Sequence, residues 1–247
     1  MKLSVLLVPI VSLSLVSCDV LNQAASAITT PSTSGQVAVP KLTNDEVISG
    51  LREALSVGIK NSVNLTSVTD GFLKNDAIRL PFPPDAIKVR EKALELNLNG
   101  QVEKFETTLN RAAEEATKEA LPIFIDAIRN MSVQDGFAVL NGGDGAATKF
   151  LKDQTTSKLV TAFAPKVKEA TSRVKLTEYW NPIINKYNTA MSFSGGQKLN
   201  PDLDAYITDL AIKGLFQMVE KEENKIRKDP AARVTEILSK VFGSLTN

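Results

Sequence analysis

Hydrophobic residues recur at intervals of three and four along most of the chain after residue 42, which is the spacing of one helical face. The first such segment follows Thr43-Asn44-Asp45-Glu46, a capping box in which Thr43 and Glu46 bond to each other's backbone N–H groups. Its apolar face is formed by Val47, Ile48, Leu51, Ala54, Leu55, Ile59 and Val63. This pattern predicts a helix that begins directly after Thr43.

Residues 102–151 combine this periodicity with the densest set of carboxylates, amides and arginines in an apolar setting. The apolar positions at the start of the segment are Val102, Phe105, Leu109, Ala112, Ala113, Ala116 and Ala120. The alanines among them favour close helix–helix packing. Pro122 either kinks this helix or opens the next one. Ser132 with Asp135 is a second N-cap signature.

Glycines and prolines mark further boundaries. The glycine pair at 142–143 ends a helix, and Asp144 is expected to cap the next one. Residues 79–84 contain three prolines and cannot form a helix or a central strand. We expect this segment to be an extended connector that packs on the core through Leu80 and Phe82.

The remaining boundaries follow the same chemistry. The Asn-Gly pair at 99–100 is expected to end a helix, and Pro165 interrupts the helical pattern, which resumes over 167–180. The Asn-Pro pair at 200–201 provides an N-cap followed by proline at the first helical position. A long helix is expected from there to about Arg227.

No segment alternates apolar and polar residues over a length typical of a strand. The predicted fold class is therefore all-α, with about eight to ten helices in a single compact domain over residues 41–247. No clean internal repeat is visible, so the pattern does not indicate a solenoid.

The first 40 residues differ in composition from the rest of the chain. Residues 1–17 have the features of a signal peptide, because Lys2 precedes an apolar run at 3–15 that is too short to span a bilayer. Residues 18–40 are rich in Ala, Ser, Thr and Gln, which predicts a flexible tether in front of the folded domain.

The junction between these two segments reads Leu15-Val16-Ser17-Cys18. It resembles a bacterial lipobox, in which the cysteine is acylated and becomes the new N-terminus. Several acyl chains on one residue give a firmer anchor than a single one. We therefore expect a lipid-anchored cell-envelope protein that faces the periplasm or the cell exterior, and Asp19 leaves open which membrane carries it.

Composition excludes several kinds of chemistry. The chain has no histidine, and its one cysteine is Cys18, so a mature domain has no His-based triad, no disulfide and no Cys- or His-ligated zinc site. The chain has 29 basic and 28 acidic residues, and removal of Lys2 with the signal peptide leaves 28 of each. This balance argues against nucleic acid as a partner. No pattern predicts a cofactor.

The candidate ligand-binding residues lie in the central segment. They are Asn110, Arg111, Glu114, Asp126 and Asp135. Carboxylates brought together in a helical core can bind a metal or act as an acid and base pair. The alternative is a buried hydrogen-bonded network in which arginines neutralise the acids, and this alternative is favoured because di-iron bundles normally include histidine. No catalytic residue and no metal ligand is assigned.

Three other patterns have simpler explanations. The glycine-rich run at 142–149 lacks the spacing and the preceding strand of a P-loop, so a helix end followed by a helix cap explains it. Residues 200–204 resemble the start of a calcium loop, but Ala205 and Ala211 replace the required Gly and Glu. The charged run at 220–228 is expected to be a solvated face, or to hold the last helix through Glu223 and Arg227.

Several phrases occur in an order that resembles one family. They are Asp70-Gly71-Phe72, Asn110-Arg111-Ala112-Ala113-Glu114, Pro122-Ile123-Phe124-Ile125-Asp126-Ala127-Ile128, Met131 with Asp135, Ala146-Ala147-Thr148, Leu203-Asp204-Ala205-Tyr206, Gly214-Leu215-Phe216, Glu222-Glu223 with Ile226-Arg227, Asp229-Pro230 and Val241-Phe242-Gly243. The chain resembles the bacterial lipoprotein family catalogued as domain of unknown function 4197. The resemblance implies a helical, exported protein and supplies no mechanism.

These observations favour a lipid-anchored binding or scaffolding module over an enzyme. Its expected partner is the membrane, through the N-terminal lipid, and a protein or small-molecule partner stays open. One alternative is a carboxylate-based enzyme, with or without a metal. Another is a carrier of a small apolar ligand, with a pocket among Phe105, Phe124, Phe137 and Phe150.

Overall fold

The structure is a computed structural model that describes residues 43–95, 97–173, 176–196, 198–200, 202–233 and 239–241. The predicted signal peptide at 1–17, the lipidation site Cys18 and the tether at 18–40 lie outside the described residues. Residues Leu42–Asn247 cluster as one unit.

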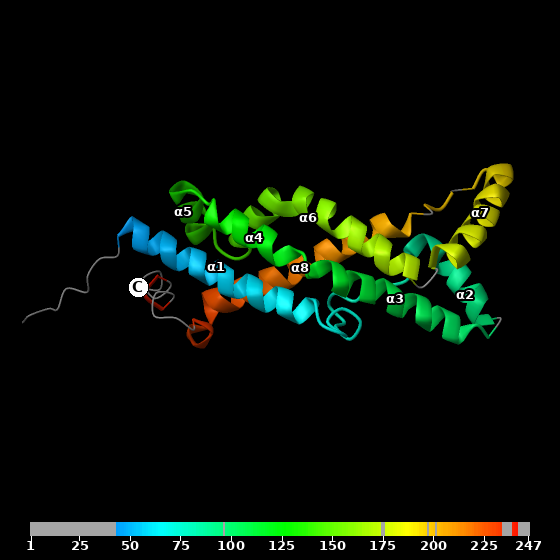
Figure 1. The fold of residues 1–247 in the computed structure, drawn as a ribbon, viewed down its shortest axis with the longest axis horizontal. Coiled ribbons are helices and arrows are strands. Elements are labelled where there is room, and N and C mark those ends of the chain that lie inside the picture. Colours follow the sequence, from blue (N-terminus) through cyan, green and yellow to red (C-terminus); the bar gives the residue numbers. More distant parts are fainter. Residues whose placement is uncertain are drawn as a thin grey trace, which may run out of the picture. The chain divides into compact units, whose positions relative to one another are not determined.

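The described residues contain helices and no strand, which confirms the predicted all-α fold class (Figure 1). The helices are α1 (Asn44–Thr66), α2 (Ile87–Glu95), α3 (Asn99–Thr117), α4 (Ala120–Arg129), α5 (Val133–Asn141), α6 (Ala146–Arg173), α7 (Leu176–Ser194) and α8 (Leu203–Lys228). Two short 3-10 turns add η1 (Pro84–Ala86) and η2 (Pro230–Ala232). No described helix has both the length and the apolar character needed to cross a bilayer.

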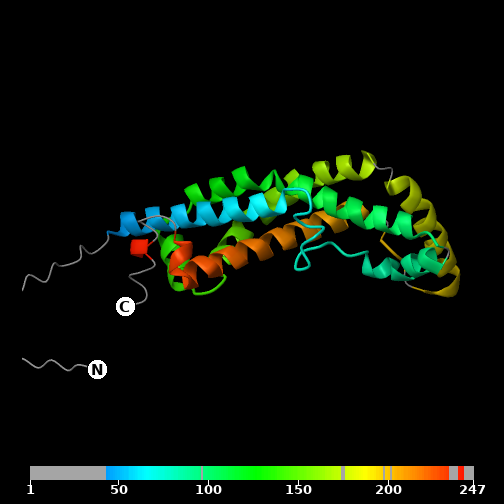
Figure 2. The same cartoon turned by 90° about the horizontal axis from the view of Figure 1, so that it is seen from below.

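Helix α8 lies at the centre of the packing, because it contacts α1, α3 and α6. Figures 1 and 2 show α1 beside the C-terminal part of α8 and α3 beside its N-terminal part. Helix α6 covers both α3 and α8, and the short helices α4 and α5 close the side next to α1. The fold therefore consists of long helices wrapped around one central helix.

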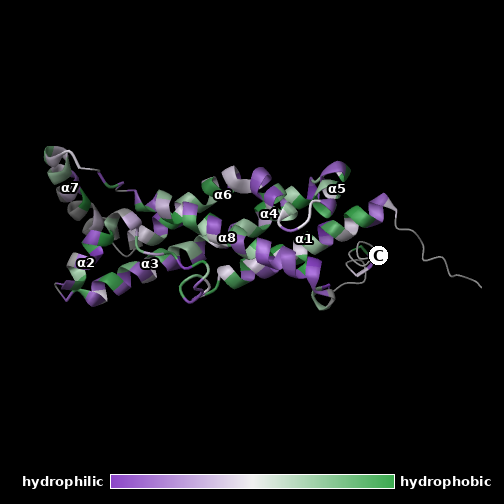
Figure 3. Cartoon of the chain, turned by 180° about the vertical axis from the view of Figure 1, so that it is seen from behind, coloured by the Kyte–Doolittle hydropathy of each residue, from purple (hydrophilic) through white to green (hydrophobic). Residues whose placement is uncertain are grey.

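The predicted apolar face of α1 is buried against this centre, with Leu51 and Ile59 almost fully inaccessible. The core also takes Leu109 from α3, Phe124 from α4 and Leu215 from α8. Along the helices, bands of hydrophobic residues alternate with hydrophilic bands (Figure 3). The burial of such stripes against each other is the main stabilising term for helices in a protein.

Both predicted capping boxes are present. Glu46 N donates to Thr43 Oγ1 over 3.2 Å, and Thr43 N donates to Glu46 Oε2 over 2.8 Å. Ser132 and Asp135 repeat the arrangement at the start of α5, with both backbone contacts at 3.1 Å. Each box satisfies backbone donors that have no partner within the helix.

The connector at 79–84 follows the prediction, since Leu80 and Phe82 are buried in the core.

Pro122 lies in the first turn of a new helix, as the third residue of α4 and not the first. A proline is tolerated there because the backbone N–H groups of the first turn have no acceptor within the helix.

Pro165 does not interrupt its helix, so this prediction was wrong. Helix α6 continues from Ala146 through Pro165 to Arg173. Pro165 lies on the exposed side, where the carbonyl group left without a donor can bond to water. Leu159, Phe163 and Val167 are fully buried on the other side and hold the helix together across the proline.

Several predicted boundaries were shifted. Helix α7 begins at Leu176, inside the predicted 167–180 segment. The N-cap of α8 is Asp202, whose Oδ1 accepts from Ala205 N over 3.0 Å, and not Asn200. Asn200 instead accepts a hydrogen bond from Asp202 N over 2.9 Å, which is an Asx turn in front of the cap.

The residues around 97–100 and 144 also differ from expectation. The Asn-Gly pair at 99–100 opens α3, because the turn lies earlier, at Asn97, whose φ of 58° is in the left-handed region. Asp144 does not supply the cap of α6, since Glu223 accepts from Ala147 N and Thr148 N. Asp144 pairs with Lys228.

Candidate functional site

The predicted polar residues of α3 hold the segment between α1 and α2. Asn110 is fully buried, and its amide pairs with the backbone of Leu80 in both directions. Leu80 N donates to Asn110 Oδ1 over 2.8 Å, and Asn110 Nδ2 donates to Leu80 O over 3.0 Å. One side chain therefore satisfies both backbone groups of a buried loop residue, which an apolar side chain could not do.

Glu114 likewise accepts hydrogen bonds from backbone N–H groups, here in the turn after α1. Its Oε1 accepts from Phe72 N over 3.1 Å and from Leu73 N over 3.2 Å. Its Oε2 accepts from Arg111 Nη1 over 2.6 Å. The side chain of Glu114 is only 5% exposed, so these contacts replace the water that a carboxylate normally requires.

Arg111 extends this group to Asp70, which lies at the start of the same turn. Arg111 Nη2 donates to Asp70 Oδ1, and Asp70 Oδ2 also pairs with Lys74 over 2.7 Å. The hydrogen bonds from Lys74 and Arg111 hold the pKa of Asp70 below its usual value. The contacts with Glu114 and Asp70 raise the pKa of Arg111. We call Asn110, Arg111 and Glu114 the α3 clamp.

The α3 clamp thus binds backbone and charge from the chain's own 70–80 segment. Both carboxylate oxygens of Glu114 have intramolecular donors, and the Arg111 guanidinium lies between two acids. This geometry is that of a buried hydrogen-bonded network in which an arginine neutralises the buried acid.

The structure does not bring the two other predicted residues to the clamp. Asp126 is more than half exposed and pairs with Lys158 of α6 over 3.0 Å, and Lys158 lowers the pKa of Asp126. Asp135 caps α5, and hydrogen bonds from Ser132 lower its pKa. Within the described ranges, no three acidic, Cys or His side chains gather closely enough to hold a metal ion.

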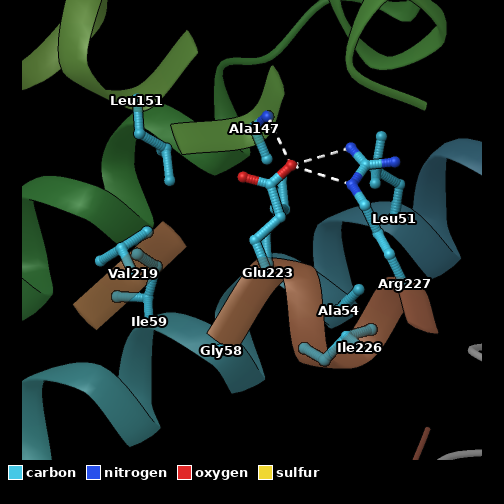
Figure 4. A pocket seen from close by; sticks show the side chains of 11 residues that line it. Leu51, Ala54, Gly58, Ile59, Ala147, Leu151, Val219, Glu223, Ile226 and Arg227 are labelled. Atoms are coloured by element: carbon cyan, nitrogen blue, oxygen red, sulfur yellow. Dashed lines mark hydrogen bonds and ion pairs between the residues drawn. The ribbon is translucent and has the colours of Figure 1, made fainter. Parts of the chain in front are cut away.

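A second buried charge group lies on α8. The Glu223 side chain is 6% exposed and that of Arg227 is 10% exposed, and Arg227 Nε donates to Glu223 Oε1 over 2.9 Å (Figure 4). Glu223 also accepts from Ala147 N over 2.9 Å and from Thr148 N over 2.8 Å, at the start of α6. A carboxylate at a helix N-terminus complements the helix dipole.

Arg227 connects the same group to the end of α5. Its Nη2 donates to Val139 O over 2.8 Å, and its Nη1 donates to Leu140 O over 3.3 Å. The two residues therefore hold α5, α6 and α8 together, and the prediction of a solvated face does not apply to them. The cavity beside them, lined by α1, α6 and α8, measures only about 20 Å³. Such a space has room for about one water molecule.

A larger pocket lies at the other end of α8. Its volume is about 340 Å³, and its described walls come from the connector with η1, from α7, and from the segment that enters α8. The lining residues with distinctive chemistry are Trp180, Tyr206, Asn200 and Asp202. Trp180 stacks on Phe105, with ring centroids 5.3 Å apart, and meets Phe82 edge-on at 6.0 Å. We call this space the Trp180 pocket.

The phenylalanines proposed for an apolar pocket do not form one group. Phe105 packs with Phe82 and Trp180, whereas Phe124 is fully buried and packs edge-on against Phe216 at 5.6 Å. Phe137 and Phe150 are partly buried at the edge of the core. None of the four is among the described residues that line the Trp180 pocket.

A family model described as a protein of unknown function, DUF4197, matches residues 41–243. The chain belongs to the DUF4197 family. The resemblance drawn from the sequence phrases is thereby confirmed, and two of those phrases, around Phe72 and Asn110, touch each other through Glu114. No curated protein and no solved structure matches the chain.

Sequence reasoning missed the Trp180 pocket in this DUF4197 chain for a physical reason. Its walls come from residues near 84, 180 and 203, which are far apart in the sequence. A single signal was present, because Trp180 is the only tryptophan. A lone tryptophan on an apolar face is ordinary core material, and only the fold shows that it borders a pocket.

Proposed function

We propose that this DUF4197 chain is a cell-envelope protein that a lipid on Cys18 anchors to a membrane, and that it acts as a binding or scaffolding module. The observation that carries the proposal is the sequence Leu15-Val16-Ser17-Cys18 at the end of a short apolar leader. Cys18 is the only cysteine in the chain, and it stands at the expected cleavage point.

The segment after Cys18 supports the same role. If these roughly 22 residues form the flexible tether that their composition predicts, their typical reach, at roughly 5–6 Å × √n, is roughly 25 Å. The folded unit begins at the capping box of Thr43, directly after this segment. A domain on such a tether stays near the membrane surface and is free to meet partners there.

A binding role agrees with the use of the buried acids. Glu114 and Glu223 each accept several hydrogen bonds from the chain's own backbone and from an arginine. A general base needs an oxygen that can reach a substrate proton. Because the oxygens of these two acids already have donors, their contacts favour a structural role over acid–base catalysis.

The anchoring is tested by replacing Cys18 with alanine. Wild-type protein should remain in the membrane fraction after an alkaline wash, and the Cys18→Ala variant should not incorporate a labelled fatty acid and should leave that fraction. Ser17→Ala is the matched control, because it keeps a small residue before the cysteine and should behave as the wild type. A Cys18→Ala variant that is as membrane-bound and as strongly labelled as the wild type would refute the anchor.

A further inference from the structure

We propose that the Trp180 pocket binds a small organic ammonium ion. The inference deepens the proposed function, since it names a ligand class for the binding module. A pocket of about 340 Å³ lies within the range of small-molecule sites, which begins at roughly 300 Å³. It is larger than the cavity beside Glu223 and Arg227, and the residues of the α3 clamp and of the Glu223–Arg227 group are not among its described lining residues.

The aromatic wall of the pocket is fixed in place. Trp180 is only 4% exposed and is held by Phe82 and Phe105. Tyr206 is held as well, because its hydroxyl donates to Pro81 O over 3.2 Å. Rigid aromatic side chains beside a pocket attract cations through the negative faces of their rings, and tryptophan does so best.

Among the described residues that line the pocket, the only charged side chain is an acid. Asp202 is its acidic residue, and no lysine or arginine occurs among the lining residues that the structure describes. Asp202 Oδ1 accepts from Ala205 N, whereas Oδ2 has no hydrogen-bond or ion-pair partner in the described part of the chain. A carboxylate oxygen is therefore available beside an aromatic wall, which is the combination that recognises an ammonium group.

The N-terminus of α8 would by itself favour an anion, since a helix dipole places about half a positive charge there. Asp202 is the N-cap and Asp204 lies in the first turn. Two full negative charges outweigh half a positive charge. The local field therefore favours a cation, and phosphate or sulfate is the wrong ligand class for this pocket.

Trp180 also carries a buried donor. Trp180 Nε1 is buried and has no hydrogen-bond partner among the residues that the structure describes. Buried donors normally have a partner. This donor has almost no accessible area, so the ligand class follows from the aromatic rings and from Asp202, and choline is a suitable probe.

The experiment titrates the full mature chain, in non-ionic detergent, with choline. Because Trp180 is the only tryptophan, its fluorescence reports on this pocket alone. The matched probe is dimethylbutanol, the neutral isostere in which carbon replaces the nitrogen of choline. We expect a saturable response with an affinity roughly tenfold higher for choline, which is the effect of one cation–π and charge interaction.

The variant Asp202→Asn separates charge from folding. Asparagine caps helices about as well as aspartate, so α8 should stay intact. Choline affinity should fall roughly tenfold in this variant, while the affinity for dimethylbutanol stays the same. Asp209→Asn is the control, because Asp209 is exposed on the same helix and pairs only with Lys213, and it should leave choline binding unchanged.

The proposal is overturned if choline gives no saturable response, if dimethylbutanol binds equally well, or if Asp202→Asn binds choline as tightly as the wild type.

A second titration with dihexanoyl phosphatidylcholine distinguishes a free ammonium ion from the headgroup of a lipid. Binding of choline alone assigns the pocket to a free ammonium ion, and comparable binding of both assigns it to a lipid headgroup. None of these readouts depends on Cys18, so failure of the pocket and failure of the anchor are separable.

Discussion

At the scale of single residues, Glu114 shows how this chain uses a buried charge. Its carboxylate holds two backbone N–H groups of the turn after α1 and one arginine, so no part of the buried charge is left without a donor. Burial of a carboxylate is unfavourable unless such partners are present. The residue therefore fixes the position of the turn on α3.

We expect Glu114→Ala to lower the free energy of unfolding by roughly 2–5 kcal/mol, because Arg111 and the N–H groups of Phe72 and Leu73 lose a buried partner. Glu115→Ala is the matched control. Glu115 is the next residue and half exposed, and its pair with Lys118 lies on the surface. The control should change the free energy by less than about 0.5 kcal/mol. Urea unfolding followed by circular dichroism measures both, and equal losses would contradict the role of the clamp.

Asp70 gives a prediction for pH. Its pKa in the folded state is lowered by Lys74 and Arg111, so the unfolded state binds more protons as the pH falls. The stabilisation from Asp70 is therefore present above the unfolded pKa of about 3.9 and is lost as the pH drops through the lower folded value. The variant Asp70→Asn should lose stability less steeply between about pH 5 and about pH 3.

This variant also suits the backbone, because Asp70 has a φ of 70° and asparagine tolerates that conformation. Its unfolding free energy should lie below that of the wild type at neutral pH, and the two curves should converge in acid. Chemical unfolding at a series of pH values tests this. Parallel curves would show that Asp70 does not contribute to the acid sensitivity.

Local chemistry at this scale was predictable from sequence, and long-range chemistry was not. The capping boxes of Thr43 and Ser132 depend on residues three positions apart, so the sequence contains the whole signal. Glu223 bonds to Thr148, 75 positions away, and no local pattern indicates that contact. For the same reason the sequence alone could not show whether Asp126 and Asp135 lie near Asn110, Arg111 and Glu114, and their actual partners are Lys158 and Ser132.

At the scale of elements, the close approach between α8 and the turn at Phe72 depends on Gly214. A Cβ atom at Gly214 would lie 2.7 Å from Phe72 Cε1 and 3.2 Å from Ile78 Cβ. Phe72 is fully buried and cannot move aside without disturbing its neighbours. The absence of a side chain at this position lets the turn pack directly on the central helix.

We expect Gly214→Ala to destabilise the protein by roughly 1–3 kcal/mol through overpacking, although alanine is intrinsically the better helix former by about 1 kcal/mol. Gly100→Ala in α3 is the control, since no heavy atom lies within 4 Å of its added Cβ. The control should be neutral or stabilising by up to about 1 kcal/mol. Thermal unfolding compares the two, and a stabilised Gly214→Ala variant would show that the turn is not packed as described.

The element pattern itself was largely predictable, because apolar residues at helical spacing mark α1, α3 and α8 directly. The effect of Pro165 was predicted wrongly because local propensity favours a break in the helix. Phe163 and Val167, which precede and follow it in the sequence, are buried, and this tertiary packing outweighs the local propensity. The start of α8 was predicted two residues too early because the Asn-Pro pair at 200–201 has the composition of a helix start. The actual N-cap is Asp202.

At the scale of the whole molecule, one helical unit with two buried charge groups follows a segment whose sequence resembles a signal peptide with a lipobox. The fold class and the family were predictable because composition, periodicity and ordered phrases all agree. The Trp180 pocket was not, because its walls meet only after α7 and α8 have packed near the connector. The central claim is that this unit is attached to a membrane by a lipid on Cys18.

The most direct test of that claim is the intact mass of the mature protein isolated from the membrane fraction. The account predicts a chain that begins at Cys18, lacks residues 1–17 and carries the additional mass of acyl chains on that cysteine. A mass equal to unmodified polypeptide, or a chain that begins at any other residue, would contradict the account.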